Sequence, residues 1–517
     1  MNIFPNILRT PDKITLCAGD EELTFDGAEI LNYNDITVSI SGGKVTLTAD
    51  SSEVKKIILR WKVMMPDNCL YYADKWERGY CDFEWRGLFC DRAYPWYMVA
   101  SKGDITACYG VKTLPDAFCS FKCLKGEISL KCEVYNGHSG VILGGKTITC
   151  AEIVNEEYTG MSAHKAMSEF AGVMAVNPVF PEKPVYGYNN WYYAYGVSSD
   201  EEITENAKQL ARLTKGLENR PYMVIDDCWQ IKHWFKGGYN GGPWREGNKE
   251  FPDMKALAEK IAAMDVIPGI WFRPLQNADE SFDESLYTNK EDYILDPTAP
   301  EVLDYIAEDV RTIIGWGYKL IKHDFSTYDI LNQWGMDLRD FPSKNAYTFR
   351  DRSLTNAQII KQLYKTIYDA ADGKAIIIGC NCVGHLGTGF FHIHRSGDDT
   401  SGRNWLGTLR LGVNTLSFRA HQQGKFFFVD GDCVGLTPKI DFEQNKEWLR
   451  LLAYSGTPLF VSVAPTTLNA EQEKYLAEML AVASQEREPA EPLDWFSDNL
   501  PSKFILDGKE TEFEWYK

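Results

Sequence analysis

The sequence predicts a multidomain protein with an N-terminal antiparallel β-sandwich, a central (β/α)8 TIM barrel and a small C-terminal β appendage. Residues 1–180 contain short segments in which apolar and polar residues alternate, separated by turns rich in Gly and Asp. From residue 185 the pattern changes to apolar strand, loop and amphipathic helix, with eight strands in about 280 residues. Residues 486–517 contain only short strand-like segments. We therefore expect domains at 1–180, 185–485 and 486–517.

The predicted sandwich contains period-two strands at residues 13–17, 36–40, 44–48 and 56–60, and the first helical pattern comes only at 160–170. An aromatic-rich segment at 76–96 has two interpretations. It belongs to the core of the sandwich, which we favour, or it forms a rim that reaches over the neighbouring domain.

A proline-rich link at 178–184 resists both helix and sheet and marks the start of the predicted barrel. The predicted strands are 185–192, 221–225, 267–272, 318–321, 375–379, 391–394, 425–429 and 458–463. The predicted helices include 200–217, 254–264, 301–314, 356–371, 445–453 and 470–484. A doubly wound open sheet is the alternative, but no dinucleotide fingerprint follows the first strand.

The composition of the chain argues against some classes of binding partner. The chain has 517 residues, 44% of them hydrophobic, and its net charge of −19 repels phosphate backbones and anionic lipid, so we expect neither nucleic acid nor membrane as a partner. No basic region followed by an apolar run opens the sequence, and we expect a cytoplasmic protein. An odd total of 13 cysteines fits free thiols there, and their spacing does not predict a structural metal.

Charged residues follow the fourth predicted strand, which ends in Lys322, His323 and Asp324. In a parallel barrel, catalytic groups lie at the carboxyl ends of the strands. The alternative is a plain salt bridge between Lys322 and Asp324, which are two positions apart on a strand and point the same way. A second strand end of this kind, residues 395–400 with the sequence RSGDDT, favours a catalytic site.

The ends of the other predicted strands contribute to the same cavity opening, which we call the mouth, and its residues are rich in carboxylates and tryptophans. Such a lining suits a sugar, because sugar ring faces stack on indole and charged groups bind hydroxyls. Its predicted residues are Asn189, Asn190, Trp191, Asp226, Asp227, Trp229, Trp271, Arg273, Lys322, Asp324, Cys380, Asn381, Arg395, Asp398, Asp399, Asp430 and Asp432.

Two carboxylates on different strands can share glycoside hydrolysis, one as nucleophile and one as acid. Asp324 is the better nucleophile, because the nearby Lys322 keeps it ionised. Repulsion within the adjacent pair Asp398 and Asp399 is expected to raise the pKa of one of them, as an acid requires, and strand alternation lets only one point into the mouth. Spacing does not choose between the two.

Four motifs resemble the α-galactosidase clan of retaining glycoside hydrolases, families 27 and 36. They are GYNNW (187–191), VIDDCW (224–229), IKHD (321–324) and RSGDDT (395–400). The resemblance implies Asp324 as nucleophile and Asp399 as acid/base, with the two carboxyls about 5 to 5.5 Å apart. It also implies Trp191 as sugar platform, Asp226 and Asp227 on the 4- and 6-hydroxyls, Lys322 and Arg395 on other hydroxyls, and no metal or cofactor.

Trp271, Cys380 and Asn381 complete the predicted substrate-binding residues. Lysosomal-type members have an acid after the fifth-strand cysteine, where it contacts the sugar's 2-position. Here that position is Asn381, so the exact sugar stays open among galactose, N-acetylgalactosamine and arabinopyranose. Arg273 is a further departure, and we consider a contact with an acidic or extended aglycone.

We therefore expect a retaining α-galactosidase-like hydrolase that acts on a glycoside or oligosaccharide. A galactosyl-transferring enzyme of the same clan and a non-catalytic carbohydrate-binding protein are the alternatives. The natural linkage and the oligomeric state stay open.

Several residues have plainer interpretations that we prefer. His385, His392 and His394 are expected to form hydrogen bonds rather than to bind a metal, and Gly384, Gly387 and Gly389 are not expected to hold a phosphate. Trp334 and Trp405 are expected to pack rather than to bind sugar. Asp430 and Asp432 are either substrate contacts or turn residues.

Overall fold

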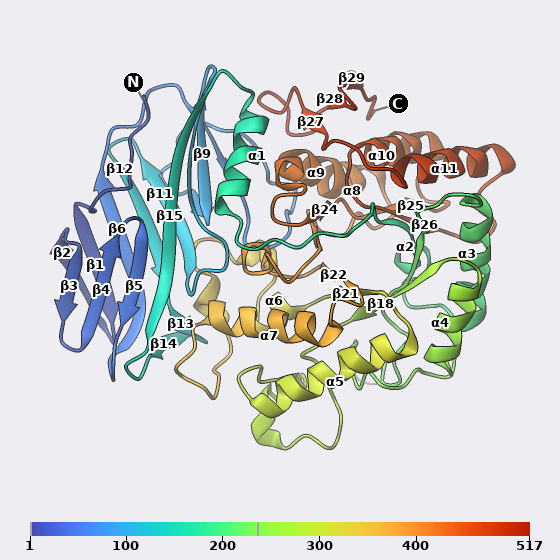
Figure 1. The fold of residues 1–517 in the computed structure, drawn as a ribbon, viewed down its shortest axis with the longest axis horizontal. Coiled ribbons are helices and arrows are strands. Elements are labelled where there is room, and N and C mark those ends of the chain that lie inside the picture. The colour runs from blue at the N-terminus through green and yellow to red at the C-terminus, as the bar shows by residue number, and fades with distance from the viewer. Residues whose placement is uncertain (1–2, 235–236, 517) are drawn as a thin grey trace.

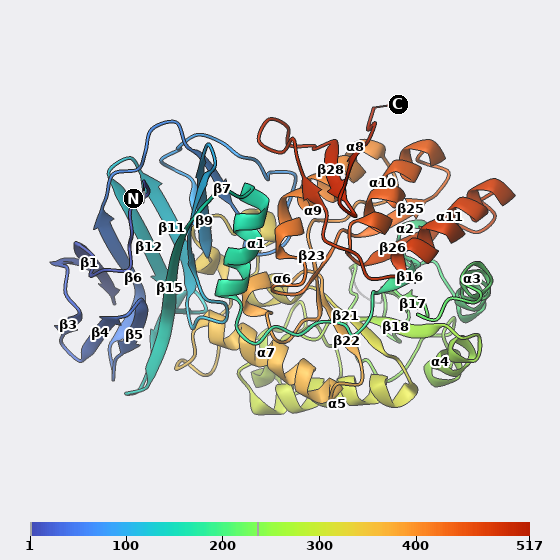
Figure 2. The same ribbon diagram turned by 45° about the horizontal axis from the view of Figure 1, so that its top comes forward.

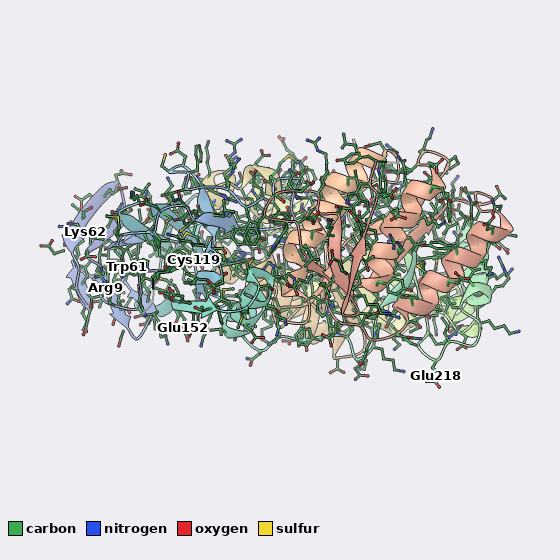
Figure 3. The ribbon with its side chains drawn as sticks, turned by 90° about the horizontal axis from the view of Figure 1, so that it is seen from above. Arg9, Trp61, Lys62, Cys119, Glu152 and Glu218 are labelled. Carbon is green, nitrogen blue, oxygen red and sulfur yellow. The ribbon has the colours of Figure 1, made fainter. Side chains whose placement is uncertain are left out.

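The computed structural model describes residues 3–234 and 237–516. The molecule is elongated, with the N-terminal sheets at one end and a group of parallel strands surrounded by helices at the other (Figure 1). Seen from above, Arg9, Trp61 and Lys62 lie at one end and Glu218 at the opposite end (Figure 3).

Two antiparallel sheets make up the N-terminal region in the described residues, and both contribute to the hydrophobic core. The eight-stranded sheet contains β1 (Lys13–Ala18), β2 (Glu21–Asp26), β6 (Glu53–Lys62), β8 (Ala93–Pro95), β11 (Phe118–Leu124), β12 (Glu127–Glu133), β13 (Tyr135–Asn136) and β14 (Ser139–Ile142). The seven-stranded sheet contains β3 (Ile30–Tyr33), β4 (Ile36–Ser41), β5 (Lys44–Thr48), β7 (Leu70–Ala73), β9 (Tyr97–Lys102), β10 (Ile105–Val111) and β15 (Thr147–Thr159).

Helix α1 (Ala163–Met174) joins these sheets to the rest of the chain. The side chain of Ser162 caps it by accepting a hydrogen bond from the backbone N–H of Lys165. Its buried Phe170 and Met174 lie against Gly110 on β10, where any side chain would collide with them. The helical pattern predicted at 160–170 is therefore confirmed, and it anchors the following link.

A nine-stranded parallel sheet lies at the centre of the second region in the described residues, in the order β24-β23-β22-β21-β18-β17-β16-β26-β25. Its strands are β16 (Tyr186–Asn189), β17 (Tyr222–Ile225), β18 (Ile267–Phe272), β21 (Leu320–His323), β22 (Ile376–Gly379), β23 (Ile393–Arg395), β24 (Phe428–Asp430), β25 (Cys433–Leu436) and β26 (Leu459–Val463). Only Gly431 and Asp432 connect the two edge strands, β24 and β25, so the sheet curls until its edges come close together.

Helices cover the outside of this curled sheet, as Figure 2 shows. They are α2 (Trp191–Ala194), α3 (Asp200–Leu213), α4 (Met254–Ala263), α5 (Pro300–Trp316), α6 (Ser326–Leu331), α7 (Asn356–Ala371), α8 (Trp405–Thr408), α9 (Asn414–Arg419), α10 (Phe442–Tyr454) and α11 (Ala470–Ala483). A short antiparallel pair, β19 (Tyr287–Asn289) and β20 (Ile294–Leu295), lies in the loop before α5.

All eight strands predicted from apolar runs are present, in the predicted order along the chain. The first is shorter than predicted, because α2 begins at Trp191. The fourth extends to His323, two residues further than predicted. Strand β25 was not predicted, since the two residues before it and Gly435 within it interrupt the apolar pattern.

The C-terminal residues form a three-stranded antiparallel sheet in the described part of the chain, made of β27 (Glu491–Pro492), β28 (Lys503–Leu506) and β29 (Lys509–Glu512). This agrees with the few short strands expected there. Among the described residues, no helix combines the length and the apolar character that crossing a membrane would require.

Candidate active site

A cavity of about 300 Å³ opens at the carboxyl ends of the parallel strands. Eight residues expected at the mouth line it, and they come from five different strand ends: Trp191, Asp226, Asp227, Trp271, Lys322, Asp324, Asp398 and Asp399. Six further residues complete the described lining: Arg78, Tyr80, Asn240, Phe325, Trp334 and Met336. The topology thus brings distant polar residues to one place, as predicted.

Asp324 follows β21, and its carboxylate is fixed by three donors. The indole N–H of Trp271 donates to Oδ2 over 3.0 Å, and the backbone N–H groups of Phe325 and Asn381 donate to Oδ1 over 2.7 and 3.1 Å. Burial acts to raise the pKa of Asp324, but the charges of Lys322 and Arg78 and these hydrogen bonds together hold it below its usual value. Asp324 is therefore an ionised, immobilised carboxylate, as a nucleophile must be.

Lys322 forms its ion pair with Asp226 rather than with Asp324. Its Nζ lies 2.7 Å from Asp226 Oδ2, and the side-chain amide of Asn189 donates to the same oxygen over 2.6 Å. The simple salt bridge between Lys322 and Asp324 is therefore not the arrangement in the structure. Lys322 acts on Asp324 through its charge instead.

Asp227 lies deep in the cavity wall and accepts hydrogen bonds from the side chains of Gln230, over 2.9 Å, and Asn240, over 3.1 Å. Burial, helped by the neighbouring Asp226, raises its pKa to about 7. The next residue, Cys228, has a φ of 90°, which is strained for a residue with a side chain. Such strain is typical of backbone that holds a functional group in place.

Asp398 and Asp399 both line the cavity, contrary to the expectation that only one would point inward. Strand alternation does not apply to them, because β23 already ends at Arg395 and the pair lies in the following loop. Arg78 lies close to both carboxylates, with Nη1 3.3 Å from Asp398 Oδ1 and 3.6 Å from Asp399 Oδ1.

The pKa of Asp399 is lowered, which contradicts the expected effect of repulsion within the pair. Burial alone would raise it, but Arg395, Arg78 and Lys322 outweigh burial and the repulsion from Asp324. Asp399 therefore carries a proton only in more acidic solution than an isolated aspartate.

Arg395, Cys380 and Asn381 are not among the described residues that line the cavity; they lie behind its wall. Arg395 is buried, with Nη2 3.0 Å from Asp432 and 3.2 Å from Asp399. It also lies 4.0 Å from Asp430, so both of these ambiguous aspartates are partners of an arginine. The position of Arg395, Cys380 and Asn381 behind the wall supports a role in orienting the carboxylates of the cavity.

An N-terminal strap, residues 74–80, reaches over the curled parallel sheet and was not predicted as part of the site. Gly79 pairs with Gly397 in a short parallel bridge, next to the two aspartates. Arg419 on α9 holds the strap by pairing with Asp74 over 2.7 Å and donating to the carbonyl of Glu77 over 2.6 Å. The strap brings Arg78 and Tyr80 into the cavity lining.

The aromatic segment at 76–96 fits both of its interpretations. Trp76, Phe83 and Trp85 are buried, as expected for core residues. Tyr80 belongs to the rim that faces the cavity. The charged pair at 77–78, set between Trp76 and Tyr80, is the signal in the sequence that marks this rim.

Glu77 is the buried carboxylate of the strap, and its side chain is fully inaccessible to solvent. It accepts hydrogen bonds from the hydroxyl of Tyr80, over 2.6 Å, and from the side-chain amide of Asn381. Burial raises its pKa to about 7 despite the charge of Arg78. Because the backbone N–H of Asn381 also binds Asp324, Glu77 is one residue removed from the predicted nucleophile.

Two residues, Trp334 and Arg273, differ from their expected roles. Trp334, expected to pack, lines the cavity, whereas Trp405 packs against Trp515 and donates to its carbonyl over 2.5 Å, as expected. Arg273 forms a two-bond ion pair with Asp329, at 3.0 and 2.6 Å, and is absent from the described cavity lining. It therefore has no free guanidinium for an aglycone.

The histidines after the fifth strand form structural contacts. His394 donates from Nε2 to the carbonyl of Cys382 over 3.0 Å, and His392 Nδ1 accepts from the backbone N–H of Ile377 over 3.1 Å. His385 instead stacks on Trp96, and neither of its ring nitrogens forms a hydrogen bond with the described residues, contrary to the expectation. In the described part of the chain, no group of three or more His, Cys, Asp or Glu side chains is arranged to hold a metal.

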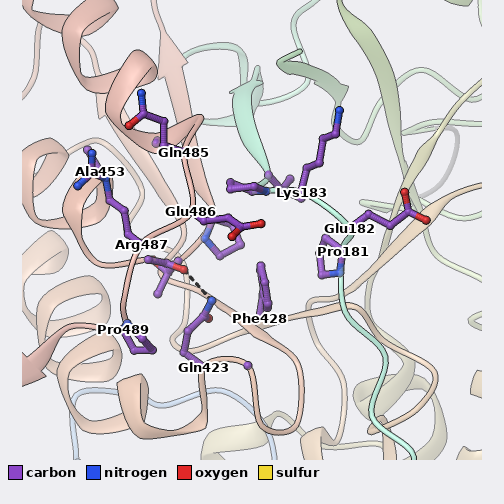
Figure 4. Close-up of a pocket in the computed structure, with 17 residues that line it drawn as sticks. Pro181, Glu182, Lys183, Gln423, Phe428, Ala453, Gln485, Glu486, Arg487 and Pro489 are labelled. Atoms are coloured by element: carbon purple, nitrogen blue, oxygen red, sulfur yellow. Dashed lines mark hydrogen bonds between the residues drawn. The ribbon is translucent and has the colours of Figure 1, made fainter. Parts of the chain in front are cut away.

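A second cavity, of about 260 Å³, lies at the amino ends of the strands, near the starts of β16, β24 and β26 (Figure 4). Prolines and apolar side chains line much of it, and the side chain of Gln423 there donates to the carbonyl of Gly456 over 2.7 Å. Its described lining also contains two carboxylates, Glu182 and Glu486, and two cations, Lys183 and Arg487. In barrels that end serves stability rather than catalysis.

No family model matches the chain. Over 142 residues it is 26% identical to an α-galactosidase of Oryza sativa subsp. japonica, and this match spans 27% of the chain and only 29% of the rice protein.

Solved structures match over nearly the whole chain. TtGalA, an α-galactosidase from Thermus thermophilus in complex with p-nitrophenyl α-D-galactopyranoside, has a TM-score of 0.59 at 15% identity, covering 96% of this chain and 98% of that one. A variant of AgaA, a GH36 α-galactosidase from Geobacillus stearothermophilus in complex with 1-deoxygalactonojirimycin, has a TM-score of 0.58 at 12% identity, covering 91% and 71%. The chain therefore has the fold of family 36 α-galactosidases, which confirms the resemblance that its motifs predict.

Proposed function

We propose that this protein is a retaining α-galactosidase-like glycoside hydrolase that acts on terminal α-galactosides. The observation that carries the proposal is that Asp324 and Asp399, from different strand ends, line one cavity. The cavity has the charged and aromatic lining of a sugar site, and the fold is that of known α-galactosidases.

In the proposed first step, Asp324 attacks the anomeric carbon while the bond to the leaving oxygen breaks. Asp399 donates its proton to that oxygen, and the sugar becomes an ester of Asp324 with inverted configuration. In the second step, Asp399 takes a proton from water, which attacks the same carbon and releases the α-sugar. Retention requires the two carboxyls to lie about 5 to 5.5 Å apart.

Substrate binding in this proposal uses the polar half of the cavity. Asp226 and Asp227 accept hydrogen bonds from the 4- and 6-hydroxyls, Lys322 donates to a neighbouring hydroxyl, and Trp191 supplies a flat face for the ring. Arg395, behind the wall, is assigned to holding Asp399 rather than to a direct sugar contact.

The test uses 4-nitrophenyl α-galactoside, β-L-arabinopyranoside and α-N-acetylgalactosaminide, followed by raffinose. We expect release from the α-galactoside, and Asp324→Asn should lower kcat by about 10⁴-fold or more with an unchanged circular dichroism spectrum. A folded protein that releases nothing but binds galactose would support a non-catalytic carbohydrate-binding protein instead. Transfer to an added sugar acceptor would favour the galactosyl-transferring enzyme.

The proposal includes three finer points, which concern the domain organisation, the cellular location and the need for a cofactor. The parallel sheet closes as a (β/α)8 barrel beside an N-terminal β-sandwich, with boundaries at residues 180 and 485 that limited proteolysis tests. The protein is cytoplasmic, in keeping with 13 cysteines that are all unpaired, and cell fractionation tests this. No cofactor is needed, so dialysis against a chelator should leave activity unchanged.

A further inference from the structure

Glu77 belongs to the N-terminal strap but not to the described lining of the cavity. Its side chain is fully inaccessible to solvent, and a glutamate is almost never buried in this way unless its carboxylate has partners that hold it. The proposed reaction uses Asp324 and Asp399 and gives Glu77 no step of its own. The role of Glu77 therefore follows from what it contacts.

Three segments of the chain enclose the Glu77 carboxylate. Within the strap, the hydroxyl of Tyr80 donates to Oε2 over 2.6 Å. Asn381, which follows the end of β22, donates its side-chain amide to Oε1. Gly335 lies so close to Oε2 that a side chain at that position would collide with it. Glu77 therefore joins the N-terminal strap to two connecting segments of the parallel-sheet region.

Asn381 also contacts the proposed nucleophile and the helix α6 that follows it. Its backbone N–H donates to Asp324 Oδ1 over 3.1 Å. The oxygen of its side chain accepts from the backbone N–H of Tyr328 on α6, over 3.3 Å, so the amide nitrogen needs a different acceptor. Glu77 Oε1 is that acceptor, and together with Tyr328 it fixes both ends of the Asn381 amide.

The backbone N–H of Asn381 matters because of the way Asp324 is held. Trp271 binds Oδ2, and the hydrogen bonds to Oδ1 set the remaining rotation of the carboxylate about its Cβ–Cγ bond. Asn381 is only 1% exposed, so its amide would stay unpaired if the acceptor were lost, unless the surrounding segment moved. A displacement of about 1 Å at a reacting group costs about a hundredfold in rate. Phe325 also donates to Oδ1, so the expected loss is partial.

We propose that Glu77 is a positioning residue for Asp324: by binding the side chain of Asn381, it holds the backbone N–H that fixes one oxygen of the nucleophile. This inference rests on the proposed hydrolase function. The N-terminal region then contributes to the rate of the reaction as well as to the wall of the cavity.

The experiment compares melibiose, whose leaving group needs a proton, with α-galactosyl fluoride, whose leaving group does not. Glu77→Ala should lower kcat/KM for both by a similar factor, about tenfold to a hundredfold, because attack by Asp324 is common to both. The inhibition constant of galactose should change by less than about threefold, since the side chains that contact the sugar stay in place. Glu77→Gln keeps an oxygen for the Asn381 amide and should recover kcat/KM to within about threefold of the wild type.

Glu133→Ala is the matched control. Glu133, on β12, is a second fully inaccessible glutamate of the N-terminal sheets, and burial raises its pKa to about 7 despite the charge of Lys131. It is not among the described residues that line the cavity. Its replacement should change kcat/KM for either substrate by less than about twofold.

Asn381→Ala removes the same contact from the other side and should reproduce the loss, and the double variant should be less than about twofold slower than the slower single variant. If Glu77→Ala does not fold, Asn381→Ala decides alone. The positioning role is overturned by a Glu77→Gln variant as slow as Glu77→Ala, by a parallel loss of galactose binding, or by a loss below about threefold in Glu77→Ala or Asn381→Ala. Release of fluoride by the wild-type protein reports the proposed function separately, and its absence would end both proposals.

Discussion

Replacing Arg78 by Met should shift the pH profile of the reaction. Arg78 Nη1 lies 3.6 Å from Asp399 Oδ1, and Arg78 is one of the cations that lower the pKa of Asp399. At this distance, a pair that is well exposed to solvent on one side contributes about 1 kcal/mol, which corresponds to about 0.7 of a pKa unit. Arg395 and Lys322 remain in the variant, so the shift should be partial.

The sign follows from the role of Asp399 as an acid. Asp399 must carry its proton in the first step, so kcat/KM falls as pH rises through its pKa. Losing a nearby cation raises that pKa, because the ionised form loses an attraction, while repulsion from Asp324 and Asp432 continues. The alkaline limb of the profile should therefore move to higher pH by about 0.5 to 1 unit.

The assay measures kcat/KM for melibiose between pH 3 and 9, because its sugar leaving group needs the acid. Arg86→Met is the control: Arg86 belongs to the same N-terminal segment but is exposed and pairs with Glu84 at 2.8 Å. An alkaline limb that stays in place or moves to lower pH in Arg78→Met would refute the reasoning.

Three further predictions concern the acid, the strap and a buried carboxylate. In steady-state assays, Asp399→Asn should lower kcat/KM by about 10² to 10⁴-fold for melibiose, whose sugar leaving group needs the acid, and far less for 4-nitrophenyl α-galactoside. If Asp398→Asn gives that pattern instead, the acid has been assigned to the wrong residue. Arg419→Met should lower the free energy of unfolding in urea by about 3 to 5 kcal/mol, because the buried Asp74 loses its cation and keeps only the neutral donors of Gln422 and the backbone of Lys75. A loss below about 1 kcal/mol would contradict this. The pKa of Glu77 in the folded protein, about 7, lies above its ordinary value, so ionisation of Glu77 destabilises the folded state as pH rises from about 4.5 to 7. Glu77→Gln should therefore make the fall of Tm over that pH range less steep. An unchanged slope would contradict this.

The strands and the carboxylates at their ends could be predicted because each depends on local sequence. An apolar run that ends in charged residues, as at Lys322 and Asp324, indicates both a buried strand and its functional end. Once the parallel order is right, the common edge of the sheet brings these residues together. No knowledge of the loops is needed for that step.

The rest of the site depends on loops that come from far away in the sequence. Arg78 reaches the cavity because Arg419 holds the strap across the curled sheet, and no sequence periodicity predicts such a contact. The same limit explains the error at Asp398 and Asp399, where the strand ends three residues earlier than alternation would need. Trp334 likewise lies in a loop. In a loop, the local sequence does not distinguish a tryptophan that is exposed in a cavity from one that packs in the core.

The central claim is that Asp324 forms a covalent bond to the sugar. Incubation with 5-fluoro-α-galactosyl fluoride should trap this intermediate, because the ring fluorine slows both steps while fluoride still leaves readily. Peptide mass spectrometry should then find one fluorogalactosyl group, on Asp324. A label on another carboxylate, or steady turnover of α-galactosides without any label, would contradict the account.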